Sequence, residues 1–82
     1  MDSGARERAK ELERLEAEER TLSARRTRLQ DRIDFLRGGG GGPVEESAEL
    51  IADLQRQERE VSEQRLELHE RIEIARAELR RG

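Results

Sequence analysis

Residues 38–43 read Gly-Gly-Gly-Gly-Gly-Pro, and this stretch divides the chain into two halves of similar length. A glycine in a helix interior costs about 1 kcal/mol relative to alanine, and a proline costs about 3 kcal/mol. No helix is therefore expected to pass through 38–43, which we interpret as a hinge. The flanking halves are rich in Glu, Arg, Leu and Ala, a composition typical of long helices and coiled coils. The sequence predicts one helix over 4–37 and a second over 44–81.

Both predicted helices have residues suited to their first turn. Asp2 or Ser3 would cap the first helix, because a short polar side chain accepts from the unpaired N–H groups there. Pro43 would open the second helix, where its missing N–H costs nothing. A short hinge between helices of similar length favours an all-α antiparallel hairpin over the whole chain, 1–82. A dimer of open chains or of hairpins stays a second arrangement, because a glycine linker also permits exchange of helices.

An apolar heptad series in each half predicts the seam of a coiled coil. The series in the two halves are Leu15, Leu22, Leu29, Leu36 and Leu54, Val61, Leu68, Ala75. A second set of seam positions is apolar towards the ends of each half but polar in the middle. Those polar seam residues are Glu19, Arg26, Glu58 and Arg65.

The composition excludes several classes of protein. Charged residues make up 45% of the chain and Phe35 is its only aromatic residue, so a compact globular core is not expected. The chain has no cysteine, which removes disulfides and thiolate metal sites and fits a cytoplasmic protein. It lacks the apolar segment of a signal peptide or a membrane span, so no membrane association is expected. The net charge of −3 argues against sequence-blind DNA binding.

Catalysis is not expected. His69 is the only histidine and cysteine is absent, so no set of nucleophile, base and orienting group is available. No cluster of His and carboxylate residues has metal-ligand spacing. The glycine run is not followed by the Lys-Ser or Lys-Thr of a phosphate-binding Walker loop. These exclusions leave a binding protein or a structural protein.

One polar pattern occurs twice, 39 residues apart. The first copy is Glu19, Ser23, Arg26, Gln30, Asp34, and the second copy is Glu58, Ser62, Arg65, His69, Glu73. In each copy the five positions fall within a stripe roughly 80° wide on a helix, which turns about 100° per residue. A comparison of 12–36 with 51–75 finds eight identical positions out of 25, which indicates an internal duplication.

Charged residues at seam positions have two interpretations. Polar seam residues often set register or partner choice at a cost in stability. In that case Glu19 would pair with Arg65, or Arg26 with Glu58, across the interface. Alternatively, the stripes bind a ligand. The planar fork of Arg fits phosphate or guanine O6 and N7, and a carboxylate accepts from guanine N1–H and N2–H₂. Two matched stripes suit a guanine nucleotide with a two-fold-like shape.

The first copy also resembles a known signature. The pattern Glu-x-x-x-Ser-x-x-Arg-x-x-x-Gln-x-x-x-Asp over 19–34 is similar to the cyclic di-GMP motif of the RsiG family of anti-sigma factors. The resemblance implies an antiparallel two-helix coil with a motif on each helix. It also implies two bound cyclic di-GMP molecules and, once they are bound, sequestration of WhiG, a flagellar-type sigma factor.

The same resemblance implies roles for the first copy. Arg26 and Asp34 would hold guanine, and Arg26, Ser23 and Gln30 would also reach phosphate. Glu19 would orient Arg26 or accept from a base.

The second copy departs from the signature at two positions. His69 stands where Gln is expected, and Glu73, one methylene longer, stands where Asp is expected. Either the second half-site binds more weakly, or two chains pair their intact first copies in a homodimer.

The sequence thus predicts an anti-sigma factor that binds cyclic di-GMP and represses transcription by sequestering a flagellar or sporulation-type sigma factor. The alternative is a structural coiled coil for oligomerisation or spacing, without nucleotide binding. A helical arm that touches RNA or DNA is disfavoured, because the chain is net acidic and has no aromatic residues for stacking on bases in its motifs.

Overall fold

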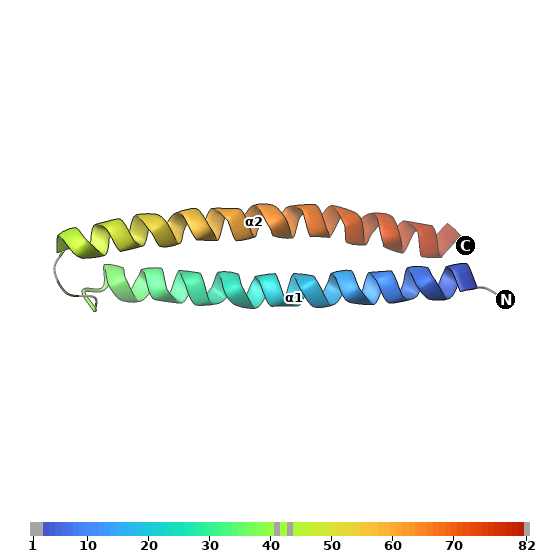
Figure 1. Ribbon diagram of the computed structural model, residues 1–82, viewed down its shortest axis with the longest axis horizontal. Helices are drawn as coiled ribbons and strands as arrows, with labels where there is room; N and C mark the ends of the chain where they lie inside the picture. The colour runs from blue at the N-terminus through green and yellow to red at the C-terminus, as the bar shows by residue number, and fades with distance from the viewer. Residues whose placement is uncertain (1–2, 41, 43, 82) are drawn as a thin grey trace.

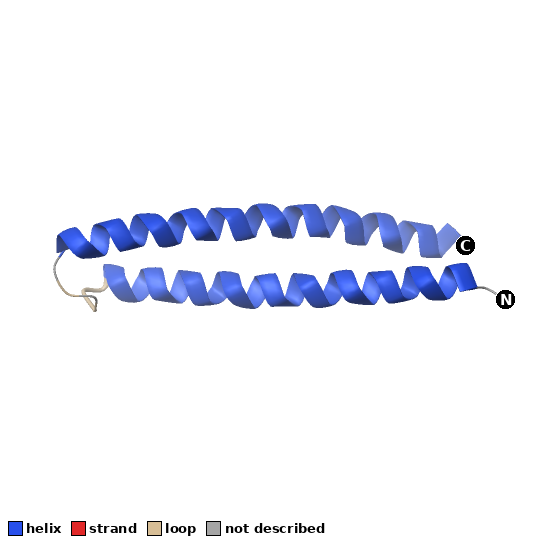
Figure 2. Ribbon diagram, viewed as in Figure 1, coloured by secondary structure: helices blue, strands red, loops and turns tan. Residues whose placement is uncertain are grey.

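Two long helices lie side by side and account for most of the chain (Figure 1). The computed structural model describes residues 3–40, 42 and 44–81, with α1 over Ser3–Arg37 and α2 over Val44–Arg81. The helices are antiparallel, so the start of α1 and the end of α2 lie at the same end of the molecule. The described residues form helix and turn but no strand, as Figure 2 shows. The predicted all-α hairpin is confirmed.

The molecule is a narrow rod with extents of 63 × 15 × 13 Å. Each helix has one neighbour, so only one stripe of its surface is buried. Within the described residues, neither helix is long and apolar enough to cross a membrane.

The core is the predicted heptad seam. It consists of two apolar clusters, and Leu22 of α1 packs against both of them. Val61 of α2 is the most completely buried large side chain, with 2% of its surface exposed. The other buried apolar residues are Leu15, Leu29, Ile33, Leu36, Leu54, Leu68, Ile72 and Ala75. Ile33 and Ile72 lie at the second set of seam positions, and the others belong to the heptad series predicted from the sequence. The seam therefore fixes the faces that the two helices turn towards each other.

A glycine-based cap ends α1 after Arg37. The N–H of Gly39 donates to the carbonyl of Leu36 at 3.1 Å, and the N–H of Gly40 donates to the carbonyl of Phe35 at 3.2 Å. These two bonds form a Schellman motif, which requires a left-handed residue, and Gly39 has a φ of 90°. A Cβ at Gly40 would collide with the ring of Phe35. Glycine is therefore favoured at Gly39 by its backbone conformation, as it is at Gly42 with a φ of 94°, whereas a side chain at Gly40 would displace the exposed ring of Phe35.

The helix bounds agree with the prediction to within one residue, since α1 begins at Ser3 instead of residue 4. The predicted first-turn roles of Asp2, Ser3 and Pro43 stay predictions. Asp2, Pro43 and the side chain of Ser3 lie outside the described part of the structure.

Candidate ligand-binding face

Two polar layers interrupt the apolar core near its middle. Arg26 of α1 donates from Nε to Oε1 of Glu58 at 2.9 Å. Arg65 of α2 donates from Nε and Nη2 to Oε1 of Glu19 at 3.4 and 3.2 Å. The four side chains are between 22% and 38% exposed, so each layer is partly open to solvent. The ion pairs predicted from the seam positions are therefore confirmed in both layers.

Each glutamate also holds the serine one turn further along its own helix. The hydroxyl of Ser23 donates to Oε1 of Glu19 at 2.9 Å, and that of Ser62 donates to Oε1 of Glu58 at 3.1 Å. The same Glu–Ser–Arg cluster is thus built twice, with the arginine supplied by the opposite helix. Glu58 contacts Arg26 directly, whereas Glu19 lies about two turns away along α1 and contacts Arg65, so the predicted contact of Glu19 with Arg26 is not formed.

An approximate two-fold axis relates the two clusters. A shift of 39 residues maps Glu19 onto Glu58 and Arg26 onto Arg65, so that it converts one interhelical ion pair into the other. The axis crosses the rod at the level of Leu22, which lies between the two layers. This symmetry agrees with the internal duplication predicted from the sequence.

Most motif residues open onto two adjoining grooves. The central groove has a volume of about 360 Å³ and is lined by Glu19, Arg26, Ser62, Arg65, Leu66 and His69. The hinge-side groove has a volume of about 340 Å³ and is lined by Gln30, Ile33, Asp34, Arg37, Gln55 and Glu58. We call the surface formed by these two grooves the motif face. Both volumes lie in the usual range for small-molecule sites, which begins at about 300 Å³.

Eight of the ten predicted site residues line the motif face; Ser23 and Glu73 do not. The half-buried Ser23 directs its hydroxyl proton to Glu19 instead of outward. Glu73 accepts from Nη1 of Arg76 at 3.4 Å, and Nη2 of Arg76 donates across the seam to Glu16 at 2.9 Å. The second copy of the motif therefore ends beside an interhelical ion pair, whereas the first copy ends in a groove.

Both seam arginines keep hydrogen-bond donors for a further partner. A guanidinium group carries five N–H donors. Within the described residues, Arg26 donates only from Nε, and Arg65 donates from Nε and one Nη atom. Both arginines line the central groove. An anionic or carbonyl-bearing ligand can therefore bind them there while their ion pairs stay intact.

The seam glutamates have lowered pKa values. The Ser23 hydroxyl and the Arg65 guanidinium lower the pKa of Glu19 below its ordinary value of 4.5, and the charge of His69 adds a smaller effect. The Arg26 guanidinium lowers the pKa of Glu58 in the same way. A carboxyl with a lowered pKa in the folded chain binds a proton less readily there than in the unfolded chain.

Acid is therefore expected to weaken the polar layers. Their contribution to stability is fully present above the ordinary pKa and is lost as the pH falls through the lower folded values. We expect the melting temperature to drop between about pH 5 and pH 3 more steeply for the native chain than for a Glu19→Gln, Glu58→Gln variant. Circular dichroism melts at several pH values measure this difference. Parallel curves for the two chains would contradict the prediction.

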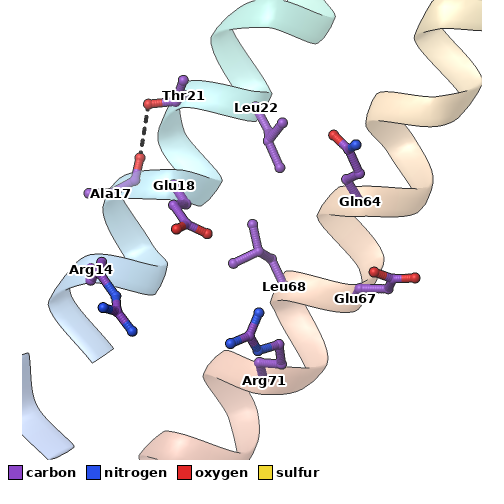
Figure 3. Close-up of a pocket in the computed structure, with 9 residues that line it drawn as sticks. All are labelled: Arg14, Ala17, Glu18, Thr21, Leu22, Gln64, Glu67, Leu68 and Arg71. Atoms are coloured by element: carbon purple, nitrogen blue, oxygen red, sulfur yellow. Dashed lines mark hydrogen bonds between the residues drawn. The ribbon is translucent and has the colours of Figure 1, made fainter. Parts of the chain in front are cut away.

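A larger groove lies on the other side of the seam (Figure 3). Its volume is about 540 Å³, and its lining residues are Arg14, Ala17, Glu18, Thr21, Leu22, Gln64, Glu67, Leu68 and Arg71. Leu22 and Leu68 point into the space between the helices, and the lining contains no motif residue. Glu18 and Ser23 project about 140° apart around α1, so the two faces are separate. Two arginines and two glutamates balance in this lining, which gives it no preference for an anion.

Arg37 and Gln55 line the motif face but were not among the predicted site residues. Arg37 follows Asp34 by one helical turn and has a counterpart 39 residues later in Arg76. This repeat lies one residue beyond the segments compared in the sequence, 12–36 and 51–75. A comparison extended by that one position would have found it.

Comparisons with protein-family models, with curated proteins and with solved structures find no match to this chain. The residues of the motif face, their geometry and the resemblance of 19–34 to the RsiG signature are therefore what bears on function.

Proposed function

We propose that this chain is a regulatory module that binds cyclic di-GMP on its motif face. The observation that carries the proposal is the reciprocal Glu–Ser–Arg cluster, which is built twice and whose two arginines line one groove on the motif face. Arginine and carboxylate side chains alternate along this face, and guanine requires both: acceptors for N1–H and N2–H₂, and donors for O6 and N7.

The first motif copy supplies the more complete half-site. Gln30, Asp34 and Glu58 line one groove together, so guanine donors and a phosphate oxygen find partners within it. Arg26 lines the adjoining groove with spare N–H donors. We assign Asp34 to the guanine edge and Arg26 to guanine O6 and N7 or to phosphate. Gln30 serves as a smaller donor to phosphate.

The two-fold character of the ligand matches that of the face. Cyclic di-GMP has two guanines and two phosphodiesters, and the interhelical ion pairs are related by an approximate two-fold axis. A ligand that spans the seam contacts both helices at once. Its binding to the folded hairpin alone would stabilise the hairpin by mass action.

The output that we propose is sequestration of a flagellar-type sigma factor. The resemblance of 19–34 to the RsiG signature supports this step. Ligand on the motif face would fix the helix pair, and the rod would then occupy sigma-factor surfaces that RNA polymerase or promoter DNA requires. Neither cofactor chemistry nor catalysis is part of this mechanism.

A structural coiled coil is the second candidate function. The observation that favours it is the pairing of all four polar seam residues with one another, which is enough to set the register of the two helices. This candidate predicts no nucleotide binding and no effect of substitutions at Asp34, which makes no hydrogen bond or ion pair through its side chain within the described residues.

Calorimetric titration with cyclic di-GMP separates the two candidates. We expect saturable binding to the native chain and a loss of roughly tenfold to hundredfold in affinity for Asp34→Ala, which removes a guanine acceptor. Glu73→Ala is expected to lose less, because Glu73 lies beside Arg76 and outside both grooves. Gln64→Ala, in the groove on the other side of the seam, is the matched control and should bind like the native chain.

Absence of heat and of any thermal shift at millimolar ligand would exclude the nucleotide-binding function and leave the structural coil. The sigma-factor step has its own readout. A WhiG-type sigma factor should co-elute with the native chain only when cyclic di-GMP is present, and not with Asp34→Ala at the same ligand concentration.

A further inference from the structure

The motif repeat extends one turn beyond the five positions, and its two ends differ in charge. Arg37 and Arg76 are related by the same shift of 39 residues as the motif residues. Arg37 follows Glu19 by 18 residues, which is about five full helical turns, so it falls within the motif stripe at the angle of Glu19. Across the seam, the same shift relates Glu16 to Gln55. The two ends thus share their arginine but not the residue near it on the other helix.

The structure shows the consequence of this difference. At the end near the chain termini, Nη2 of Arg76 donates to Glu16 at 2.9 Å, which ties α2 to α1. At the hinge end, Arg37 and Gln55 line an open groove together with Asp34. The neutral amide of Gln55 offers Arg37 no charge to pair with. One repeated arginine is therefore engaged in an interhelical ion pair, and the other borders an open groove of about 340 Å³.

We propose that Arg37 is a sixth ligand-binding position of the motif face and that Glu16 restrains its counterpart Arg76. This inference rests on the proposed function and adds to it an order of binding. The hinge-side site, with Arg37, binds the anionic phosphodiester of the nucleotide more tightly. The half-site of the second motif copy, near the chain termini, must first displace Arg76 from Glu16, so it binds more weakly. Replacing Glu16 by Gln and Gln55 by Glu would reverse this order.

Two single substitutions test the proposal in opposite directions. Gln55→Glu gives Arg37 the carboxylate that Arg76 already has, and it is expected to weaken the tighter binding step roughly tenfold. Glu16→Gln releases Arg76 and is expected to tighten the weaker step by a similar factor. Arg37→Gln should weaken the tighter step as much as Gln55→Glu does. Gln64→Glu, which adds the same charge to α2 in the groove on the other side of the seam, is the control for a general charge effect.

A purely structural role predicts a different pattern. Loss of the Glu16–Arg76 ion pair lowers the melting temperature slightly, because both side chains are between 35% and 47% exposed. In the Glu16→Gln variant, the weaker binding step should nevertheless become tighter while the melting temperature falls. Unchanged affinities in Arg37→Gln and Glu16→Gln, with Asp34→Ala still defective, would overturn this inference alone. A native chain that binds no cyclic di-GMP would overturn it together with the proposed function.

Discussion

A chain with leucine at all four polar seam positions is expected to melt more than about 10 °C above the native chain and to lose cyclic di-GMP binding. The substitutions are Glu19→Leu, Arg26→Leu, Glu58→Leu and Arg65→Leu. They replace two partly buried ion-pair layers by apolar layers that continue the core on both sides. Replacement of a buried ion pair by apolar residues of similar size stabilises proteins by up to about 4 kcal/mol. In a domain of this size, 1 kcal/mol corresponds to about 4–8 °C.

The opposite effects on stability and binding make this variant informative. If the polar layers existed only to set register, the native chain would not bind the nucleotide, and their loss would change only the stability, the register or the oligomeric state. If the polar layers bind a ligand, the native chain is less stable than the leucine variant because its binding function requires these polar residues. Thermal melts by circular dichroism, calorimetry with cyclic di-GMP and light scattering measure the three quantities. A leucine variant that still binds the nucleotide like the native chain would contradict the role assigned to both arginines.

Substitution of only one residue of an ion pair is the control for this experiment. Glu58→Leu alone leaves Arg26 without its partner at the partly buried seam and removes the acceptor of the Ser62 hydroxyl. A charge that loses its partner in a partly buried position costs more than the pair contributes. This variant should therefore melt below the native chain, although it carries one of the same four substitutions.

The fold was predictable because the period of the apolar residues and the position of the hinge agree. Leu15, Leu29 and Leu54 are buried where the heptad series placed them, and α1 ends at Arg37, next to the glycine run. The helix-breaking glycine run and the heptad pattern of apolar residues both lead to the same hairpin. The close approach of the Phe35 ring to Gly40 was not predictable from the sequence, because it depends on the path of the turn and not on the period of the apolar residues.

The candidate site was predictable in its residues but only partly in its contacts. The sequence alone allowed the Glu19–Arg65 pair, because opposite charges at polar seam positions of two packed helices can pair across the interface. It did not reveal the bond between Arg76 and Glu16, since these residues lie beside the seam. Their contact depends on the axial alignment of the two helices, which the hinge and the polar layers determine together. The contacts of side chains that flank a seam are therefore known only from the three-dimensional structure.

Charge reversal in the polar layers is expected to unfold the chain. Glu19→Arg and Glu58→Arg together turn both layers into arginine pairs opposite Arg65 and Arg26. Two like charges 4 Å apart repel by about 4 kcal/mol at the effective dielectric constant near a protein surface. Two such layers exceed the lower range of stability for small domains, which is about 5 kcal/mol. Helicity measured by circular dichroism at neutral pH and low salt should be largely lost, and added salt should restore part of it.

Restoration of the pairs in reverse separates the structural role of the layers from their binding role. Adding Arg26→Glu and Arg65→Glu to the reversed chain gives each layer one carboxylate and one guanidinium again, but on exchanged helices. We expect this fourfold variant to recover the helicity of the native chain. It should not recover cyclic di-GMP binding, because Ser23 and Ser62 would then lie one turn from an arginine and each motif stripe would present its charges in the opposite order. Native-like affinity in the inverted chain would show that the polar layers act through register alone.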